Sequence, residues 1–86
     1  MIFVEESKFK KEIGIYKIVN LANGKVYIGQ TGQNFQRRYW HHQWKLRNNS
    51  HDNKYLQNAW NKYGEDNFSF EVVEITTKDS LDEREK

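Results

Sequence analysis

The 86-residue chain contains no cysteine and no proline. Without cysteine, a disulfide framework and any zinc site that needs a thiolate are excluded, so packing must hold the fold together. No run of residues approaches the roughly 20 apolar positions that a membrane-spanning helix requires, and the charged N-terminus lacks the apolar core of a secretory signal. We therefore expect one small domain that resides in the cytoplasm and does not engage a membrane.

Acidic residues are scarce in the middle of the chain. Residues 13–64 contain eight basic residues and a single carboxylate, Asp52, whereas residues 65–86 contain eight carboxylates and three basic residues. The formal net charge of +2 therefore conceals a basic body and an acidic tail. A basic body favours a polyanion such as nucleic acid as partner, although ordinary solubilising charge would give the same composition.

Aliphatic residues are also few, and aromatic residues must supply part of the core. Hydrophobic residues make up 36% of the chain, which contains three Trp, five Tyr and five Phe. We interpret Trp40, Trp44 and Trp60 as core residues rather than as platforms for stacking bases.

Two segments are typical of a β-hairpin. Residues 14–20 and 25–30 are rich in β-branched and aromatic residues, and they flank Asn23-Gly24, a dipeptide characteristic of tight hairpin turns. A two-residue turn is the expected connection, and a four-residue connection is the alternative.

Tyr16 and Tyr27 emerge on the same face of this hairpin with either connection, because both connections preserve the alternation of side chains. The two-residue turn places Tyr16 opposite Thr31, and the longer connection brings the two tyrosines closer together. Gly14 and Gly29 lie on the same face, where missing side chains would suit the close approach of a large ligand such as a phosphate chain. Two tyrosines that simply pack under helices are the alternative interpretation.

The rest of the chain is predicted to contain two helices, a third strand and the start of a last helix, over residues 35–47, 54–63 and 68–75 and from Leu81. Asn34 caps the first helix, and Gly64 ends the second. Residues 1–12 lack periodicity and are expected to form a loose lead-in. The order ββααβα predicts an α+β domain, with a small three-stranded antiparallel sheet flanked by helices.

Arg38 and His42 are four residues apart in the first predicted helix, so they share one face. Arginine presents a planar set of donors that matches phosphate, and histidine can move a proton near neutral pH. The alternative is the solvated side of an amphipathic helix. Three histidines without cysteine are weak evidence for a zinc site, and we set zinc aside. Glu85 in the last helix is either a solvated charge or a ligand for Mg²⁺, which often needs only one or two carboxylates.

These residues resemble a known family. The tripeptides Gly14-Ile15-Tyr16 and Tyr27-Ile28-Gly29 are followed in order by Arg38, His42, His51 and Glu85. The pattern resembles the GIY-YIG nuclease family over about residues 13–86, and most of all the catalytic domains of intron-encoded and phage homing-type endonucleases.

The resemblance implies a DNA endonuclease that hydrolyses phosphodiester bonds with one Mg²⁺ or Mn²⁺ and a water molecule. It implies that the metal ligand is Glu85 and that the catalytic residues are Tyr16, Tyr27, Arg38, His42 and His51. Tyr16 is the candidate that activates or positions the water, and His42 is the competing proton acceptor. We expect phosphate contacts from Lys25, Arg37, Lys45, Arg47 and Lys54.

Domains of this family usually continue beyond the metal ligand, so residues 13–86 are expected to form a catalytic module that ends early. A separate DNA-recognition domain would then lie outside this chain. Two alternatives are a ββα-metal nuclease that uses histidine and a nucleic-acid-binding module without catalysis.

Overall fold

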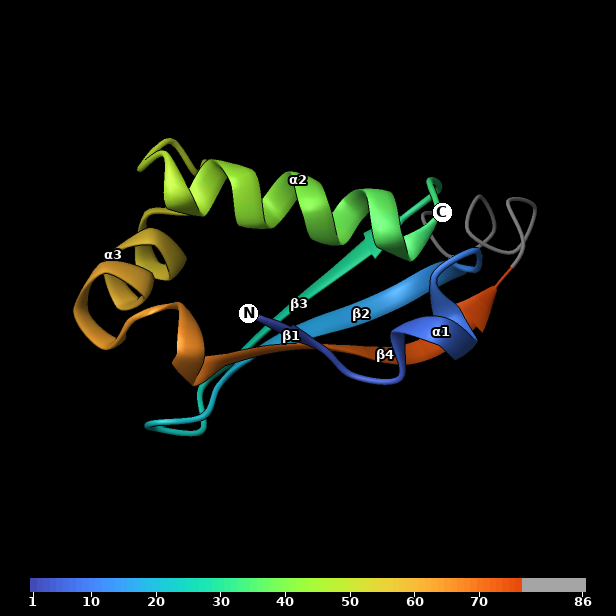
Figure 1. Cartoon of the computed structure of the whole chain (residues 1–86), viewed down its shortest axis with the longest axis horizontal. Coiled ribbons are helices and arrows are strands. Elements are labelled where there is room, and N and C mark those ends of the chain that lie inside the picture. Colours follow the sequence, from blue (N-terminus) through green and yellow to red (C-terminus); the bar gives the residue numbers. More distant parts are fainter. Residues whose placement is uncertain (77–86) are drawn as a thin grey trace.

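The computed structural model describes residues 1–76 (Figure 1). Its elements in chain order are β1 (Ile2–Phe3), α1 (Glu6–Phe9), β2 (Ile13–Asn20), β3 (Val26–Thr31), α2 (Phe35–Arg47), α3 (Lys54–Tyr63), the 3₁₀ turn η1 (Glu65–Asn67) and β4 (Phe68–Thr76). The hairpin and the helices predicted over residues 35–47 and 54–63 are confirmed. The helix expected from Leu81 lies outside the described residues. No helix within residues 1–76 is both long and apolar enough to cross a membrane.

The sheet has four strands in the order β1-β4-β2-β3, and it is mixed. β1 runs parallel to β4, whereas β2 pairs antiparallel with both β3 and β4. The expected three-stranded antiparallel sheet is therefore wrong, and residues 1–12 are not a loose lead-in. Phe3 of β1 is buried opposite Phe70. A strand of two residues is too short to show a period of two in the sequence, which is why the prediction missed it.

The hairpin uses the four-residue connection, over residues 21–24, so the two-residue turn is wrong. Tyr16 lies opposite Gly29, and Ile18 lies opposite Tyr27. The wider loop is stabilised because the side-chain oxygen of Asn20, which is buried, accepts a hydrogen bond of 2.9 Å from the backbone N–H of Ala22. The prediction that the two tyrosines share a face is confirmed.

α2 and α3 lie over one face of the sheet (Figure 1). The core between these layers contains Phe3, Tyr16, Ile18, Phe35, Leu46, Leu56, Trp60, Phe68 and Phe70, so most of it is aromatic, as predicted. The rings of Tyr16 and Phe70 stack with their centroids 4.8 Å apart. Each such ring that is fully buried stabilises the fold by about 1.5–3 kcal/mol relative to exposure.

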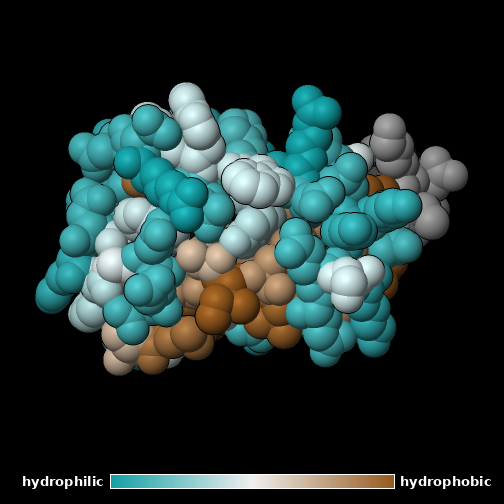
Figure 2. Space-filling view, viewed as in Figure 1, coloured by the Kyte–Doolittle hydropathy of each residue, from teal (hydrophilic) through white to brown (hydrophobic). Residues whose placement is uncertain are grey.

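Two of the three tryptophans are not in the core. Trp60 is buried as predicted, but Trp40 and Trp44 are 56% and 62% exposed. The reason is helical periodicity, because α2 faces the sheet through residues such as Phe35 and Leu46, and positions 40 and 44 then lie on the opposite side. In Figure 2 the apolar side chains on this side of the molecule gather over the strands, below a largely hydrophilic α2.

Candidate active site

The hydroxyl oxygen of Tyr16 is the meeting point of three side chains. It lies 2.6 Å from Nε2 of His42 and accepts a hydrogen bond of 3.2 Å from Nε of Arg38. Tyr16 comes from β2, and its two partners come from α2, 22 and 26 residues later. The helix spacing predicted from the sequence therefore places both partners over the same tyrosine.

The start of α2 determines which side chains reach Tyr16. The side-chain oxygen of Asn34 accepts a hydrogen bond of 2.8 Å from the backbone N–H of Arg37, which confirms the predicted N-cap. Phe35 follows and is fully buried. Because Phe35 fixes which side of the helix faces the sheet, Arg38 and His42 follow on that side one and two turns later.

Gly29 leaves room for the Tyr16 ring. A Cβ atom at Gly29 would lie 2.5 Å from the hydroxyl oxygen of Tyr16 and 2.6 Å from its Cζ. At Gly14, a Cβ atom would lie 2.1 Å from the carbonyl oxygen of Glu74, and φ is +147°. Packing inside the protein therefore requires both missing side chains. Gly29 also lines a hollow beside Tyr16, so the expected approach of a ligand to this face stays a prediction.

A second histidine supports the first. Nδ1 of His42 lies 2.7 Å from Nε2 of His51, and the two rings stack with centroids 4.9 Å apart. The backbone N–H of Asn53 donates to Nδ1 of His51 over 3.0 Å. The backbone N–H of His51 in turn donates to the buried side chain of Gln57 over 3.1 Å.

Both histidines are neutral at pH 7. Burial, followed by the positive charge of Arg38, lowers the pKa of His42 to about 3. Burial also lowers the pKa of His51 below its usual value. A neutral imidazole carries one hydrogen, so one ring nitrogen donates and the other accepts.

This chain of hydrogen bonds fixes where each hydrogen lies. The N–H of Asn53 can only donate, so Nδ1 of His51 accepts and its ring hydrogen is on Nε2. That hydrogen points at Nδ1 of His42, which leaves the hydrogen of His42 on Nε2, directed at Tyr16. The oxygen of Tyr16 therefore accepts two N–H donors.

The cluster opens into a hollow of about 290 Å³ between β3 and α2. Tyr16, Arg38, His42, Lys45 and His51 all line it. The ammonium group of Lys45 lies 3.0 Å from a carboxylate oxygen of Asp52 and lowers the pKa of that carboxyl. We name this space, with its lining side chains, the tyrosine hollow.

Sequence and structure comparisons agree on the family. A family model described as the GIY-YIG catalytic domain matches residues 12–86. This chain belongs to the GIY-YIG nuclease family.

Two solved structures of the catalytic domain of I-TevI are similar to this GIY-YIG chain. A mutant of the intron endonuclease I-TevI is 35% identical, with 85% of this chain and 75% of that chain covered and a TM-score of 0.75. The catalytic domain of the homing endonuclease I-TevI is 34% identical, with 86% and 80% covered and a TM-score of 0.76. Membership of this family implies a DNA endonuclease and removes the ββα-metal alternative.

Tyr27, the second tyrosine of the GIY-YIG motif, does not line the tyrosine hollow. It packs against the core, and the ammonium group of Lys25 lies 5.9 Å from its ring centroid. The same ammonium group lies 5.8 Å from the ring centroid of Tyr55. A catalytic role for Tyr27 stays a prediction.

The predicted phosphate contacts occupy different places in this GIY-YIG domain. Lys45 is in the tyrosine hollow, Arg37 borders a neighbouring hollow, and Lys54 borders a third that His51 shares. The guanidinium of Arg47 is paired with the carboxylate of Glu65 at 2.8 Å. Their roles in DNA binding also stay predictions.

The metal ligand expected for a GIY-YIG nuclease, Glu85, lies outside the described residues. Residues 1–76 contain no group of three or more His, Cys, Asp or Glu side chains that could hold a metal ion. The nitrogens of His42 and His51 are already engaged in hydrogen bonds. The histidine cluster is therefore suited to controlling Tyr16 rather than to ligating a metal.

The sequence analysis missed two supporting residues of the GIY-YIG site, Asn53 and Gln57. Asn53 is recognisable as the N-cap of α3, since its side chain accepts from the backbone N–H groups of Tyr55 and Leu56. Gln57 is a polar residue next to Leu56 on the buried side of α3. Neither signal reveals that the two residues hold His51.

Proposed function

We propose that this protein hydrolyses DNA phosphodiester bonds through a water molecule that Tyr16 activates, with one bound divalent metal ion. The observation that supports this function best is the convergence of Arg38 and His42 on the oxygen of Tyr16, beside a hollow that is also lined by Lys45 with its partner Asp52. A base beside a cationic phosphate clamp is the arrangement that phosphodiester hydrolysis requires.

Tyr16 acts as the base in this proposal. His42 and Arg38 each direct an N–H group at the oxygen of Tyr16, so both groups would donate to this oxygen in the phenolate form. The phenolate then removes a proton from the attacking water as the water oxygen bonds to phosphorus. The proton moves to Tyr16, the bond from phosphorus to the 3′-oxygen breaks, and the leaving oxygen takes a proton from solvent water.

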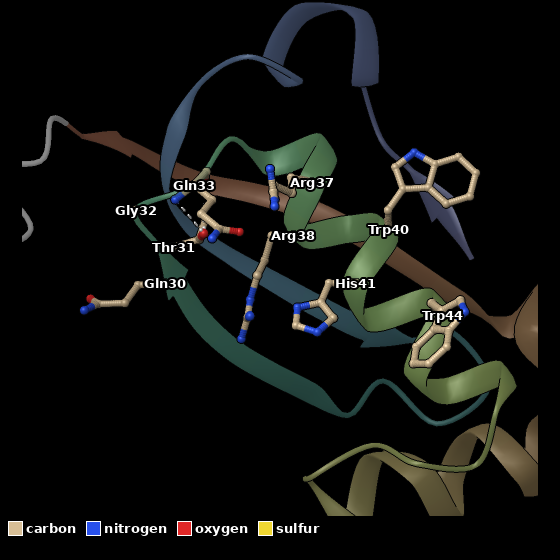
Figure 3. A pocket seen from close by; sticks show the side chains of 9 residues that line it. All are labelled: Gln30, Thr31, Gly32, Gln33, Arg37, Arg38, Trp40, His41 and Trp44. Atoms are coloured by element: carbon tan, nitrogen blue, oxygen red, sulfur yellow. Dashed lines mark hydrogen bonds between the residues drawn. The ribbon is translucent and has the colours of Figure 1, made fainter.

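Arg38 links the base to the substrate. Its Nε–H donates to the oxygen of Tyr16, and its side chain extends away from α2 (Figure 3). A guanidinium has five N–H donors, so it can bind Tyr16 and a phosphate oxygen together. Arg38 thereby stabilises the negative charge that develops on the phosphoryl group.

Glu85 is the proposed ligand of one Mg²⁺ or Mn²⁺. One carboxylate is sufficient, because Mg²⁺ in such sites is completed by water and substrate phosphate oxygens. When bound, the ion would neutralise charge on the phosphoryl group and on the leaving oxygen. We also propose that target choice depends on a separate DNA-recognition domain, since both compared structures are catalytic domains of an intron or homing endonuclease.

Plasmid nicking tests the proposed function. The protein should convert supercoiled plasmid to the nicked form with Mg²⁺ or Mn²⁺ and should lose this activity in EDTA. Glu85→Gln should need a higher metal concentration for the same rate, while binding of a short duplex in EDTA stays unchanged. Binding to DNA without nicking under any of these metal conditions would favour the non-catalytic module instead.

The hydrogen positions predict how His42 variants behave. Glutamine can place an N–H near the position of Nε2 but cannot accept a proton, so His42→Gln should retain nicking within about tenfold if His42 only donates to Tyr16. His42→Leu removes the donor and should reduce nicking by about a hundredfold. Single-turnover nicking rates at pH 7 measure both effects. Equal loss in both variants would show that His42 is the base.

A further inference from the structure

A second hollow of about 710 Å³ lies along the outer side of α2, next to the tyrosine hollow. It is lined by residues 30–33 and by Arg37, Arg38, Trp40, His41 and Trp44 (Figure 3). We call the part formed by Arg37, Trp40, His41 and Trp44 the tryptophan face. The two hollows share Arg38 and His41, so a strand held in one can continue into the other.

Packing within the fold does not account for the tryptophan face. Trp40 and Trp44 are 56% and 62% exposed, whereas Trp60 is buried in the core. The indole of Trp40 meets the ring of Tyr39 edge-on, at 6.3 Å between centroids. Two large aromatic rings one turn apart beside guanidinium groups are typical of a surface on which nucleobases stack.

The charge of the second hollow matches a polyanion. Arg37 and Arg38 both line it, and no carboxylate from the described part of the chain does so. A protein partner with an apolar surface would not need two guanidinium groups beside the indoles. A nucleic acid supplies both a π face and a phosphate for each nucleotide.

The spacing of the indoles favours unpaired nucleotides over a duplex. Positions 40 and 44 are about 6 Å apart along the helix axis, at about 1.5 Å per residue. Bases within a duplex are about 3.4 Å apart and present only their edges to a protein in the grooves. Neighbouring bases must therefore be unstacked before both indoles can meet a base face.

We propose that the tryptophan face binds unpaired nucleotides of the DNA strand that is cut, with their bases stacked on Trp40 and Trp44 and a phosphate on Arg37. This inference rests on the proposed nuclease function and names the preferred substrate, which is DNA with a single-stranded segment beside the cleaved linkage. Arg38 and His41 connect this segment to Tyr16 across the two hollows.

Binding to matched DNA ligands in EDTA tests the tryptophan face without cleavage. The ligands are a blunt duplex and the same duplex with a single-stranded tail of six thymidines on one end. The wild-type protein should bind the tailed duplex at least about tenfold more tightly, with quenching of tryptophan fluorescence. The Trp40→Ala and Trp44→Ala double variant should lose this preference and keep its affinity for the blunt duplex within about threefold.

Tyr55→Ala is the matched control, because Tyr55 is 75% exposed on α3 and does not line the second hollow. It should keep the tail preference. Equal wild-type affinity for the two ligands would overturn the proposal and leave the tryptophan face for a protein partner. A tail preference that persists in a folded double variant would also overturn it. If the protein prefers the tailed duplex but does not nick plasmid with Mg²⁺ or Mn²⁺, the proposed nuclease function is wrong and the proposed binding site is supported.

Discussion

Replacing Tyr16 with phenylalanine should reduce DNA nicking by about a thousandfold while the protein stays folded. The ring stack on Phe70 at 4.8 Å does not involve the hydroxyl group and is retained. The change removes the oxygen that Arg38 and His42 both contact, and with it the proposed base. Two donors lose their acceptor, so we expect unfolding to become easier by about 1–3 kcal/mol. Single-turnover nicking and urea denaturation measure the two effects.

Tyr39→Phe is the matched control for Tyr16→Phe. The Tyr39 hydroxyl lies within hydrogen-bond distance of the backbone carbonyl of Met1 and the side-chain oxygen of Gln43, which compete for its one hydrogen. The control therefore also removes a partly buried, hydrogen-bonded hydroxyl. It lies outside the tyrosine hollow and should leave nicking within about threefold of the wild type. Nicking at the wild-type rate by Tyr16→Phe would remove Tyr16 from the mechanism and with it the proposed base.

Gly29→Ala should reduce nicking by at least about a hundredfold through one added methyl group. That group would lie 2.5 Å from the Tyr16 oxygen and 2.6 Å from Cζ, which is closer than atoms can pack. The Tyr16 ring is held against Phe70, so it must tilt and carry its oxygen away from Arg38 and His42. A displacement of about 1 Å in a catalytic group is enough for such a loss.

Gly32→Ala provides the control, because an added Cβ atom there meets nothing within 4 Å. It should nick DNA at the wild-type rate. Chemical shifts of the Tyr16 and His42 rings should change in Gly29→Ala and stay in place in Gly32→Ala. If Gly29→Ala shows unchanged shifts and full activity, the narrow space around Tyr16 has no role in placing the base.

The shared face of Tyr16 and Tyr27 was predictable because it depends only on the alternation of side chains along strands. The placement of Arg38 and His42 was predictable in the same way, from the helical period and the Asn34 cap. Strand alternation and helical periodicity are both local properties, so each can be recognised from a short segment of sequence.

Other features depend on contacts between distant segments. The pairing of β1 with β4 joins residues more than 60 positions apart, and two-residue strands leave no pattern in a sequence. The exposure of Trp40 and Trp44 follows from which side of α2 the sheet covers, and composition alone does not reveal that side. The contact between Nδ1 of His42 and Nε2 of His51 likewise exists only because the residues after α2 fold back on that helix.

The short strand β1 supports the candidate active site indirectly, through Phe70. Phe3 meets Phe70 edge-on with centroids 4.9 Å apart, and Phe70 is the ring on which Tyr16 rests. Val4 adds a backbone hydrogen bond of 2.9 Å to the carbonyl oxygen of Phe70. A shortened protein that begins at the family motif would lose the contact of Phe3 with Phe70. Phe70 would then be less firmly held, and so would the ring of Tyr16 that stacks on it.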